Sequence, residues 1–189
     1  MNKSAAQPEH EIKELVVRSA DCQFADLNGR LMTYRVDSDI AVLAHVPAVG
    51  LSALVRFTQP ESKADPEAAR ENPWMFADTA LPLVLSLLRR YGAEDSDISL
   101  HAVGAVVDPE DEGSVTRSAN NEAALRRVLG KEKLTLAGED LGGDALRSIW
   151  FDAKSGRLLV RSSARRSLRN DSGLARFAAA NGLEMEIAS

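Results

Sequence analysis

Sulfur and imidazole are scarce in this sequence, which has one cysteine, Cys22, and three histidines among its 189 residues. A single cysteine excludes an internal disulfide and fits a reducing compartment. No apolar run reaches the roughly 18 residues that a membrane span needs, and the N-terminus lacks the pattern of a signal peptide. These absences predict a cytoplasmic protein with no membrane insertion.

An excess of positive charge is also missing. Lysine and arginine number 23 against 28 acidic residues, which gives a net charge of −5 and a pI near 5.3. Such a balance argues against a nucleic-acid partner and against binding to anionic membranes. The hydrophobic content of 44% and the charged content of 27% are ordinary for a globular protein of one domain.

The apolar residues that are present concentrate in residues 31–58. Aliphatic and β-branched side chains fill 40–46 and 49–57, and Pro47 and Gly50 break the run, so two central strands are expected. A group of polar residues precedes the first of them: Thr33, Asp37, Ser38 and Asp39. Side chains at strand ends are held by a rigid sheet, so this group is the candidate functional site.

The remaining pattern alternates between strands and helices. Short strands are expected at 13–18 and 22–25, a charged loop at 59–72, a helix at 74–91, a strand at 97–107, a second helix at 121–129, and a hairpin within 134–160. The predicted fold is a mixed α/β layered sandwich. Residues 1–20 are expected to be a loose segment, 21–162 the domain, and 163–189 an extension with a basic patch (Arg165, Arg166, Arg169) and a short helix.

Several motifs in this order resemble the CheD chemoreceptor glutamine deamidases. Residues 38–42 correspond to that family's Ser-Cys-Val-Ala-Val, residues 50–54 to its Gly-Gly-Met-Ala-His, residues 78–82 to its Asp-x-Ala-x-Pro, and residues 139–143 to its Glu-Asp-x-Gly-Gly. The resemblance covers residues 21–162. It implies a CheD-like layered sandwich of mixed β-sheets with helices packed on one side, and no cofactor or metal.

The same resemblance puts Asp39 in the position of the catalytic cysteine and Leu54 in that of the histidine, while Thr33 falls where the family has threonine. Hydrolysis of a side-chain amide through a thioester needs a thiolate and a base that generates it. A carboxylate would have to form a mixed anhydride from an unactivated amide, and Leu54 cannot accept a proton. The site Thr33, Asp39, Leu54 is therefore predicted to be degenerate, with a loss of several powers of ten in rate.

Several other residues carry reactive or charged side chains. Cys22 could be a relocated nucleophile, but a small buried residue on a strand is the better interpretation. His45 and His101 are expected to be structural, because no further His/Cys cluster completes a metal site. The acidic turn at 108–113 lacks the ligand spacing of a calcium loop. Arg147 is expected to pair with Asp140 on the surface.

The function expected from the resemblance is that of a CheD-like chemotaxis protein that has lost catalysis and acts by binding. Its partner would be the cytoplasmic helices of a chemoreceptor or a CheC-like phosphatase. One alternative is an active protein-glutamine deamidase with a rearranged site built on Thr33, Asp39 or Cys22. Another is a scaffold repurposed outside chemotaxis, since a fold does not dictate function.

Overall fold

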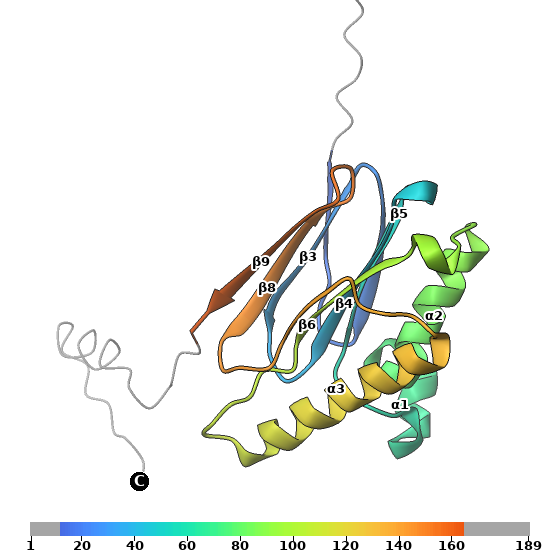
Figure 1. Cartoon of the computed structure of the whole chain (residues 1–189). Helices are drawn as coiled ribbons and strands as arrows, with labels where there is room; N and C mark the ends of the chain where they lie inside the picture. Colours follow the sequence, from blue (N-terminus) through green and yellow to red (C-terminus); the bar gives the residue numbers. More distant parts are fainter. Residues whose placement is uncertain (1–11, 165–189) are drawn as a thin grey trace, which may run out of the picture.

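A computed structural model describes residues 12–164 as a layered sandwich of two β-sheets and three α-helices (Figure 1). The strands are β1 (Lys13–Val16), β2 (Asp21–Asp26), β3 (Gly29–Val36), β4 (Ile40–Val46), β5 (Leu51–Phe57), β6 (Ser99–Gly104), β7 (Gly138–Leu141), β8 (Leu146–Asp152) and β9 (Arg157–Ser163). The helices are α1 (Pro66–Glu71), α2 (Ala77–Arg90) and α3 (Glu112–Glu132).

The strands divide into an outer sheet with the order β1-β3-β8-β9 and an inner sheet with the order β2-β5-β4-β6-β7. Each sheet has one parallel pair, β1 with β3 and β6 with β7, and its other pairs are antiparallel. Helices α1, α2 and α3 lie on the side of the inner sheet that faces away from the outer sheet (Figure 1). The predicted sandwich of mixed sheets with helices on one side is confirmed.

The central hairpin forms as the apolar runs predict. Strand β4 spans Ile40–Val46, and the short 3₁₀ turn η1 (Pro47–Val49) leads into β5 at Leu51. Gly50 ends this turn with φ of +65°, a conformation that costs glycine little. Pairing runs from Ile40 with Phe57 to Val46 with Leu51.

Alternating side chains of the inner sheet build two separate cores. Val42, Val55 and Phe57 face the helices and pack with apolar residues of α2 and α3. Leu43 and Leu54 face the outer sheet and pack with its inward side chains, among them Leu31, Ile149 and Phe151. The inner sheet is thus apolar on both faces, which explains its continuous apolar runs.

The predicted helix boundaries needed correction. Pro73 opens a 3₁₀ turn, η3 (Pro73–Met75), and α2 begins only at Ala77. The predicted loop 59–72 contains η2 (Ser62–Ala64) and α1. The second helix, α3, starts at Glu112 because the Asp111 carboxylate accepts a hydrogen bond from the Gly113 amide.

Part of the segment 1–20 that was predicted to be loose forms a strand, β1. Strand β1 pairs with β3, and Val17 is buried between the sheets. Of the extension predicted at 163–189, the structure describes only Ser163 and Ala164. The predicted basic patch and short helix lie outside the described residues. In residues 12–164, no helix combines the length and the apolar character needed to cross a membrane.

Candidate functional site

The polar group at the front of the central strands lies between the two sheets. Thr33 is on β3 of the outer sheet, Asp39 precedes β4, and Arg56 on β5 is paired with Ala41 at the beginning of β4. The exposed fractions of the three residues are 0% for Thr33, 7% for Asp39 and 7% for Arg56. The structure therefore brings together two predicted site residues, Thr33 and Asp39, and one unpredicted residue, Arg56.

The Asp39 carboxylate is held on both of its oxygens. Arg56 Nε donates to Oδ2 at 2.5 Å, and the Ser19 hydroxyl donates to the same oxygen at 3.3 Å. The backbone amide of Asp37 donates to Oδ1 at 2.8 Å. These three donors satisfy both oxygens of the buried carboxylate.

The Arg56 guanidinium is satisfied by acceptors of the outer sheet as well. Nη1 donates to Thr33 Oγ1 at 3.1 Å and to the Tyr34 carbonyl at 2.8 Å, and Nη2 donates to the Arg35 carbonyl at 3.2 Å. Thr33 Oγ1 in turn donates to the Val17 carbonyl at 2.8 Å. The Thr33 hydroxyl is thus engaged both as donor and as acceptor.

An irregular stretch of β3 presents those carbonyls to Arg56. The register of β3 with β8 shifts between Thr33 and Val36, which marks a β-bulge, and Arg35 has φ of +53°. Bulges leave backbone groups unpaired in the ladder. Here the Tyr34 and Arg35 carbonyls accept from Arg56, so the bulge and the arginine form one hydrogen-bonded unit.

The backbone at Asp39 is fixed by a close approach of β6. Gly104 has φ of +130°, and a Cβ added there would lie 2.2 Å from the Asp39 carbonyl oxygen. The next amide, of Ala105, donates to that same oxygen at 2.9 Å. Only glycine permits this contact, so Gly104 sets the position of Asp39.

From the helical side, Asn121 of α3 holds the neighbouring backbone. Its amide nitrogen donates to the Ser38 carbonyl at 2.9 Å and to the Thr58 carbonyl at 3.1 Å. It thereby ties the start of β4 to the end of β5, the two segments that carry Asp39 and Arg56.

The chemistry available here is limited by what surrounds Asp39. An arginine stays protonated in proteins, so Arg56 cannot act as a general base. Both carboxylate oxygens of Asp39 are already bonded, and the group is almost fully buried. The site provides a closed ion pair between Asp39 and Arg56.

Leu54, predicted in the base position, is not the β5 residue that meets Asp39. It pairs with Leu43 and Gln23 across the inner sheet and is fully buried in the core between the sheets. Leu54 and Arg56 share one face of β5, so the side chain opposite the Asp39 carboxylate comes two residues later. The signal for it was an arginine in the otherwise uncharged strand Leu51–Phe57.

Cys22 lies apart from Asp39 and Arg56. It pairs with Val55 on β2 and packs against the helix-side core, on the face of the inner sheet opposite to Asp39 and Arg56. Burial, assisted by the nearby charge of Asp21, raises the pKa of the Cys22 thiol well above its ordinary value. A thiol in this setting stays protonated and is a weak nucleophile.

His45 and His101 lie toward the other end of the inner sheet. His45 is near the end of β4, its Nδ1 is 2.9 Å from Ser52 Oγ, and its ring meets Phe151 edge-on. His101 on β6 is paired with Leu43, and its Nε2 is 3.4 Å from Ser99 Oγ. Within residues 12–164, no group of three or more His, Cys, Asp or Glu side chains is placed to bind a metal ion.

The predicted Asp140–Arg147 pair is present, with Nη2 to Oδ1 at 2.8 Å and Nε to Oδ2 at 3.2 Å. Its arginine is more buried than a surface bridge implies, because only 10% of the Arg147 side chain is exposed. This two-pronged contact fixes β7 against β8.

These features define a layered α/β protein with an arginine–aspartate pair closed between its sheets. Comparison with known proteins places it further: residues 59–162, more than half of the chain, match the family described as "CheD chemotactic sensory transduction". The chain belongs to the CheD family. The matched stretch begins after Arg56, so Thr33, Asp39 and Arg56 lie outside it.

Whole relatives extend the match across most of the chain. Probable chemoreceptor glutamine deamidase CheD of Solibacter usitatus is 30% identical over 157 residues, 82% of this chain and 92% of the relative. Probable chemoreceptor glutamine deamidase CheD 1 of Syntrophus aciditrophicus is 29% identical over 79% of this chain and 94% of its own.

More distant matches reach a bacterial deamidase and one solved structure. Chemoreceptor glutamine deamidase CheD of Thermotoga maritima is 27% identical over 70% of this chain and 82% of its own. The crystal structure of Neisseria meningitidis protein NMB0706 is 10% identical with a TM-score of 0.34, over 71% of this chain and 59% of that one.

Proposed function

We propose that this protein is a catalytically inactive member of the CheD family that works in bacterial chemotaxis, in the cytoplasm, by binding the cytoplasmic helices of a chemoreceptor. The observation that carries the proposal is the buried pair of Asp39 and Arg56. The chemoreceptor is chosen because the relatives are named for action on it. A CheC-like phosphatase is the second partner to test.

Two features support loss of deamidation. A protein side-chain amide must reach the nucleophile, but Asp39 and Arg56 are each 7% exposed and bonded to one another. In addition, amide hydrolysis of the family's kind needs a thiolate and a neighbouring base, and Asp39 with Arg56 supplies neither. Removal of such a catalytic unit costs about a millionfold in rate where it has been measured.

The test measures turnover and binding on the same samples. The full chain is incubated with a chemoreceptor cytoplasmic fragment from the same organism, and the glutamine-to-glutamate mass change and released ammonia are followed. The Thermotoga maritima relative with its own receptor serves as the active control. The expected result is stable capture of the fragment without turnover.

Each other outcome overturns part of the proposal. Turnover that is abolished by Asp39→Ala would establish a rearranged active site. Capture of a CheC-like protein but not of the receptor would replace the partner. Failure to bind either protein would indicate a scaffold used outside chemotaxis.

A second experiment tests the assignment of Arg56 to the position opposite Asp39. In a Cys22→Ser background, Asp39→Cys is combined with Arg56→His or, as the matched control, with Leu54→His and Arg56→Leu, so that both variants lack the guanidinium. An imidazole beside a thiol lowers the thiol pKa. The ultraviolet absorbance of the thiolate, which needs no reagent to enter the buried site, should therefore appear at lower pH with Arg56→His than in the control. The opposite order would show that Leu54 holds the base position.

A further inference from the structure

No other described element covers the outward face of the outer sheet. The helices lie on the far side of the inner sheet (Figure 1), and residues 12–164 place no helix or strand over this face. Its side chains border an open groove of about 600 Å³ that runs over β3, β8 and β9. A sheet face of this kind normally buries its apolar residues against another layer.

Apolar side chains form a single row across this face, one from each strand. The register aligns Val16 of β1 with Met32 of β3, Met32 with Trp150 of β8, and Trp150 with Leu159 of β9. Val16 is 47% exposed and Leu159 is 40% exposed, whereas Trp150 is half-buried and Met32 between them is only 6% exposed. Tyr34 meets the Trp150 ring edge-on at 5.5 Å and enlarges the row.

The length of the row and the spacing of its side chains match the apolar stripe of an amphipathic α-helix. Neighbouring strands lie about 4.8 Å apart, so four aligned side chains span roughly 14 Å. An α-helix rises 5.4 Å per turn, and residues at i, i+3, i+7 and i+10 therefore meet such a row over about three turns. An amphipathic helix laid across the strands would cover all four apolar positions.

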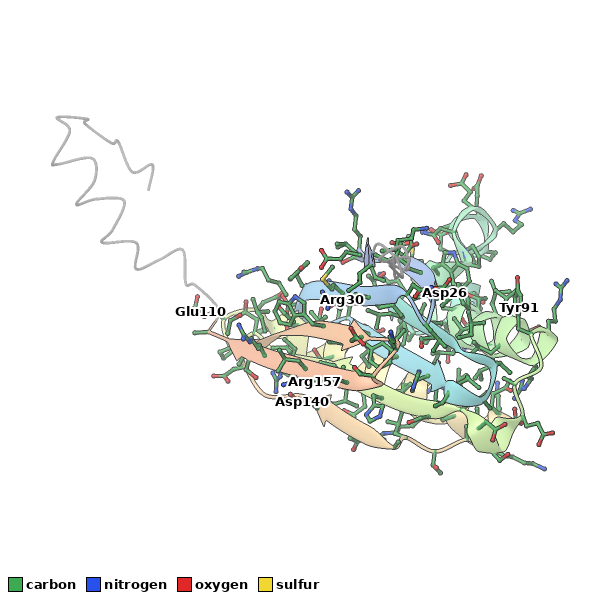
Figure 2. The ribbon with its side chains drawn as sticks, turned by 90° about the horizontal axis from the view of Figure 1, so that it is seen from above. Asp26, Arg30, Tyr91, Glu110, Asp140 and Arg157 are labelled. Atoms are coloured by element: carbon green, nitrogen blue, oxygen red, sulfur yellow. The ribbon has the colours of Figure 1, made fainter. Side chains whose placement is uncertain are left out.

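The arginines beside the apolar row determine the charge of the helix that can bind there. Arg30 is already paired with Glu14 at 3.6 Å and with Asp152 at 3.2 Å. Arg157 and Arg161 flank Leu159 on β9 and, among the described residues, form no ion pair. Arg161 instead lies over the Trp150 ring, 5.6 Å from its centre. Arg30 and Arg157 are labelled in Figure 2, which shows both on the outer sheet.

We infer that this face, defined by Val16, Met32, Trp150, Leu159 and their flanking arginines, is a docking surface for an acidic amphipathic helix of a protein partner. The apolar row takes the helix's apolar stripe, and its flanking carboxylates meet Arg157 and Arg161. Trp and Arg are the residue types that dominate binding energy at protein interfaces. The surface is on the face of the outer sheet opposite to Asp39 and Arg56, and its assignment does not depend on the proposed function.

The occupant is a protein helix and not a polyanion. Nucleic acid presents no apolar stripe to the row formed by Val16, Met32, Trp150 and Leu159. A phosphate backbone also gains nothing from Val16 and Leu159, whose exposed area rewards an apolar partner.

The test uses a synthetic probe and the full chain. A peptide of about 20 residues, long enough to be helical in water, carries leucine at helical spacing with glutamate on both flanks, and a matched peptide has lysine in place of glutamate. Binding is followed by calorimetry and by Trp150 fluorescence in a Trp74→Phe background. The glutamate peptide should bind, with affinity that falls as salt rises, and the lysine peptide should not.

Variants locate the site. Arg157→Glu/Arg161→Glu should weaken binding of the glutamate peptide about tenfold or more, because two interface arginines are reversed. The control Arg70→Glu/Arg90→Glu makes the same change of charge on the helical side of the molecule and should leave affinity unchanged. Equal effects of the two double variants would overturn the assignment.

Each alternative ligand of this surface predicts a different experimental result. Absence of a Trp150 response to the glutamate peptide would refute the surface. Binding to phosphatidylserine vesicles in preference to the peptide would replace the protein helix by a membrane. A concentration-dependent dimer that Leu159→Ser dissociates would show a second copy of this chain to be the occupant.

Discussion

The Asp39–Arg56 pair can be tested by a double-mutant cycle on the full chain with Asp39→Ala, Arg56→Leu and the combined variant. Each side chain is 9% exposed. Removing one partner of a buried pair leaves the other charge uncompensated and costs about 3–5 kcal/mol. For a protein of this size, a loss of about 3 kcal/mol lowers Tm by roughly 6–12 °C.

The two single variants should differ. In Asp39→Ala, the guanidinium keeps its bonds to Thr33 Oγ1, the Tyr34 carbonyl and the Arg35 carbonyl. In Arg56→Leu, those carbonyls lose their donor and the Asp39 carboxylate loses its counter-charge, so this variant should be the less stable. The combined variant removes both charges and should be about 2–3 kcal/mol more stable than the sum of the single losses predicts.

Urea denaturation, followed by circular dichroism, measures these free energies of unfolding. The control is the same cycle on Glu122 and Arg126, an exposed pair one helical turn apart in α3 with 40% and 45% of their side chains exposed. Its coupling should be about 0.3–0.5 kcal/mol. A coupling of that small size at Asp39–Arg56 would mean that water screens the pair, and the interpretation of a closed site would fail.

Three further outcomes follow from single residues. Gly104→Ala should strongly lower the urea midpoint, because the new Cβ would lie 2.2 Å from the Asp39 carbonyl oxygen. The control Gly130→Ala in α3, with open space around it, should leave stability equal or higher. Similar effects of the two variants would contradict the close contact at Gly104. Burial, and secondarily the charge of His101, lowers the pKa of His45 below its ordinary 6.5, so the unfolded chain binds that proton more readily. The free energy of unfolding should therefore decline as pH falls below about 6.5, and His45→Asn should reduce the decline. Cys22 should react with iodoacetamide only after unfolding, since its thiol pKa is raised; rapid reaction of the native protein would show an accessible thiolate.

The strands were predictable from the sequence because their apolar runs have few competing interpretations. Residues 40–46 coincide with β4, and the predicted turn at Pro47 and Gly50 is where η1 lies. Helix starts were less predictable, since several residues can cap. The Asn72 side chain accepts from the Trp74 amide and holds a separate 3₁₀ turn, and the extended Phe76 then delays α2 to Ala77.

The candidate site was half predictable. Thr33 and Asp39 were identified because their places relative to the first central strand are local. The partner on β5 depends on how the connection through η1 sets the register, and motif alignment selected Leu54 although Arg56 makes the contact. Both residues face the outer sheet, so side-chain alternation could not distinguish them. Their distances from the Asp39 carboxylate do distinguish them, and those distances are known only from the three-dimensional fold.

The geometry of Arg56 gives this residue a structural role. Its strand belongs to the inner sheet, but the Thr33 hydroxyl and the Tyr34 and Arg35 carbonyls that it contacts belong to β3 of the outer sheet. A thiol beside an imidazole would leave the carbonyls of the β3 bulge without these donors. The guanidinium is long enough to reach them while Asp39 neutralises its charge, and the cost of burying both ions is offset by the hydrogen bonds that they complete. The arginine therefore joins the two sheets beside Asp39.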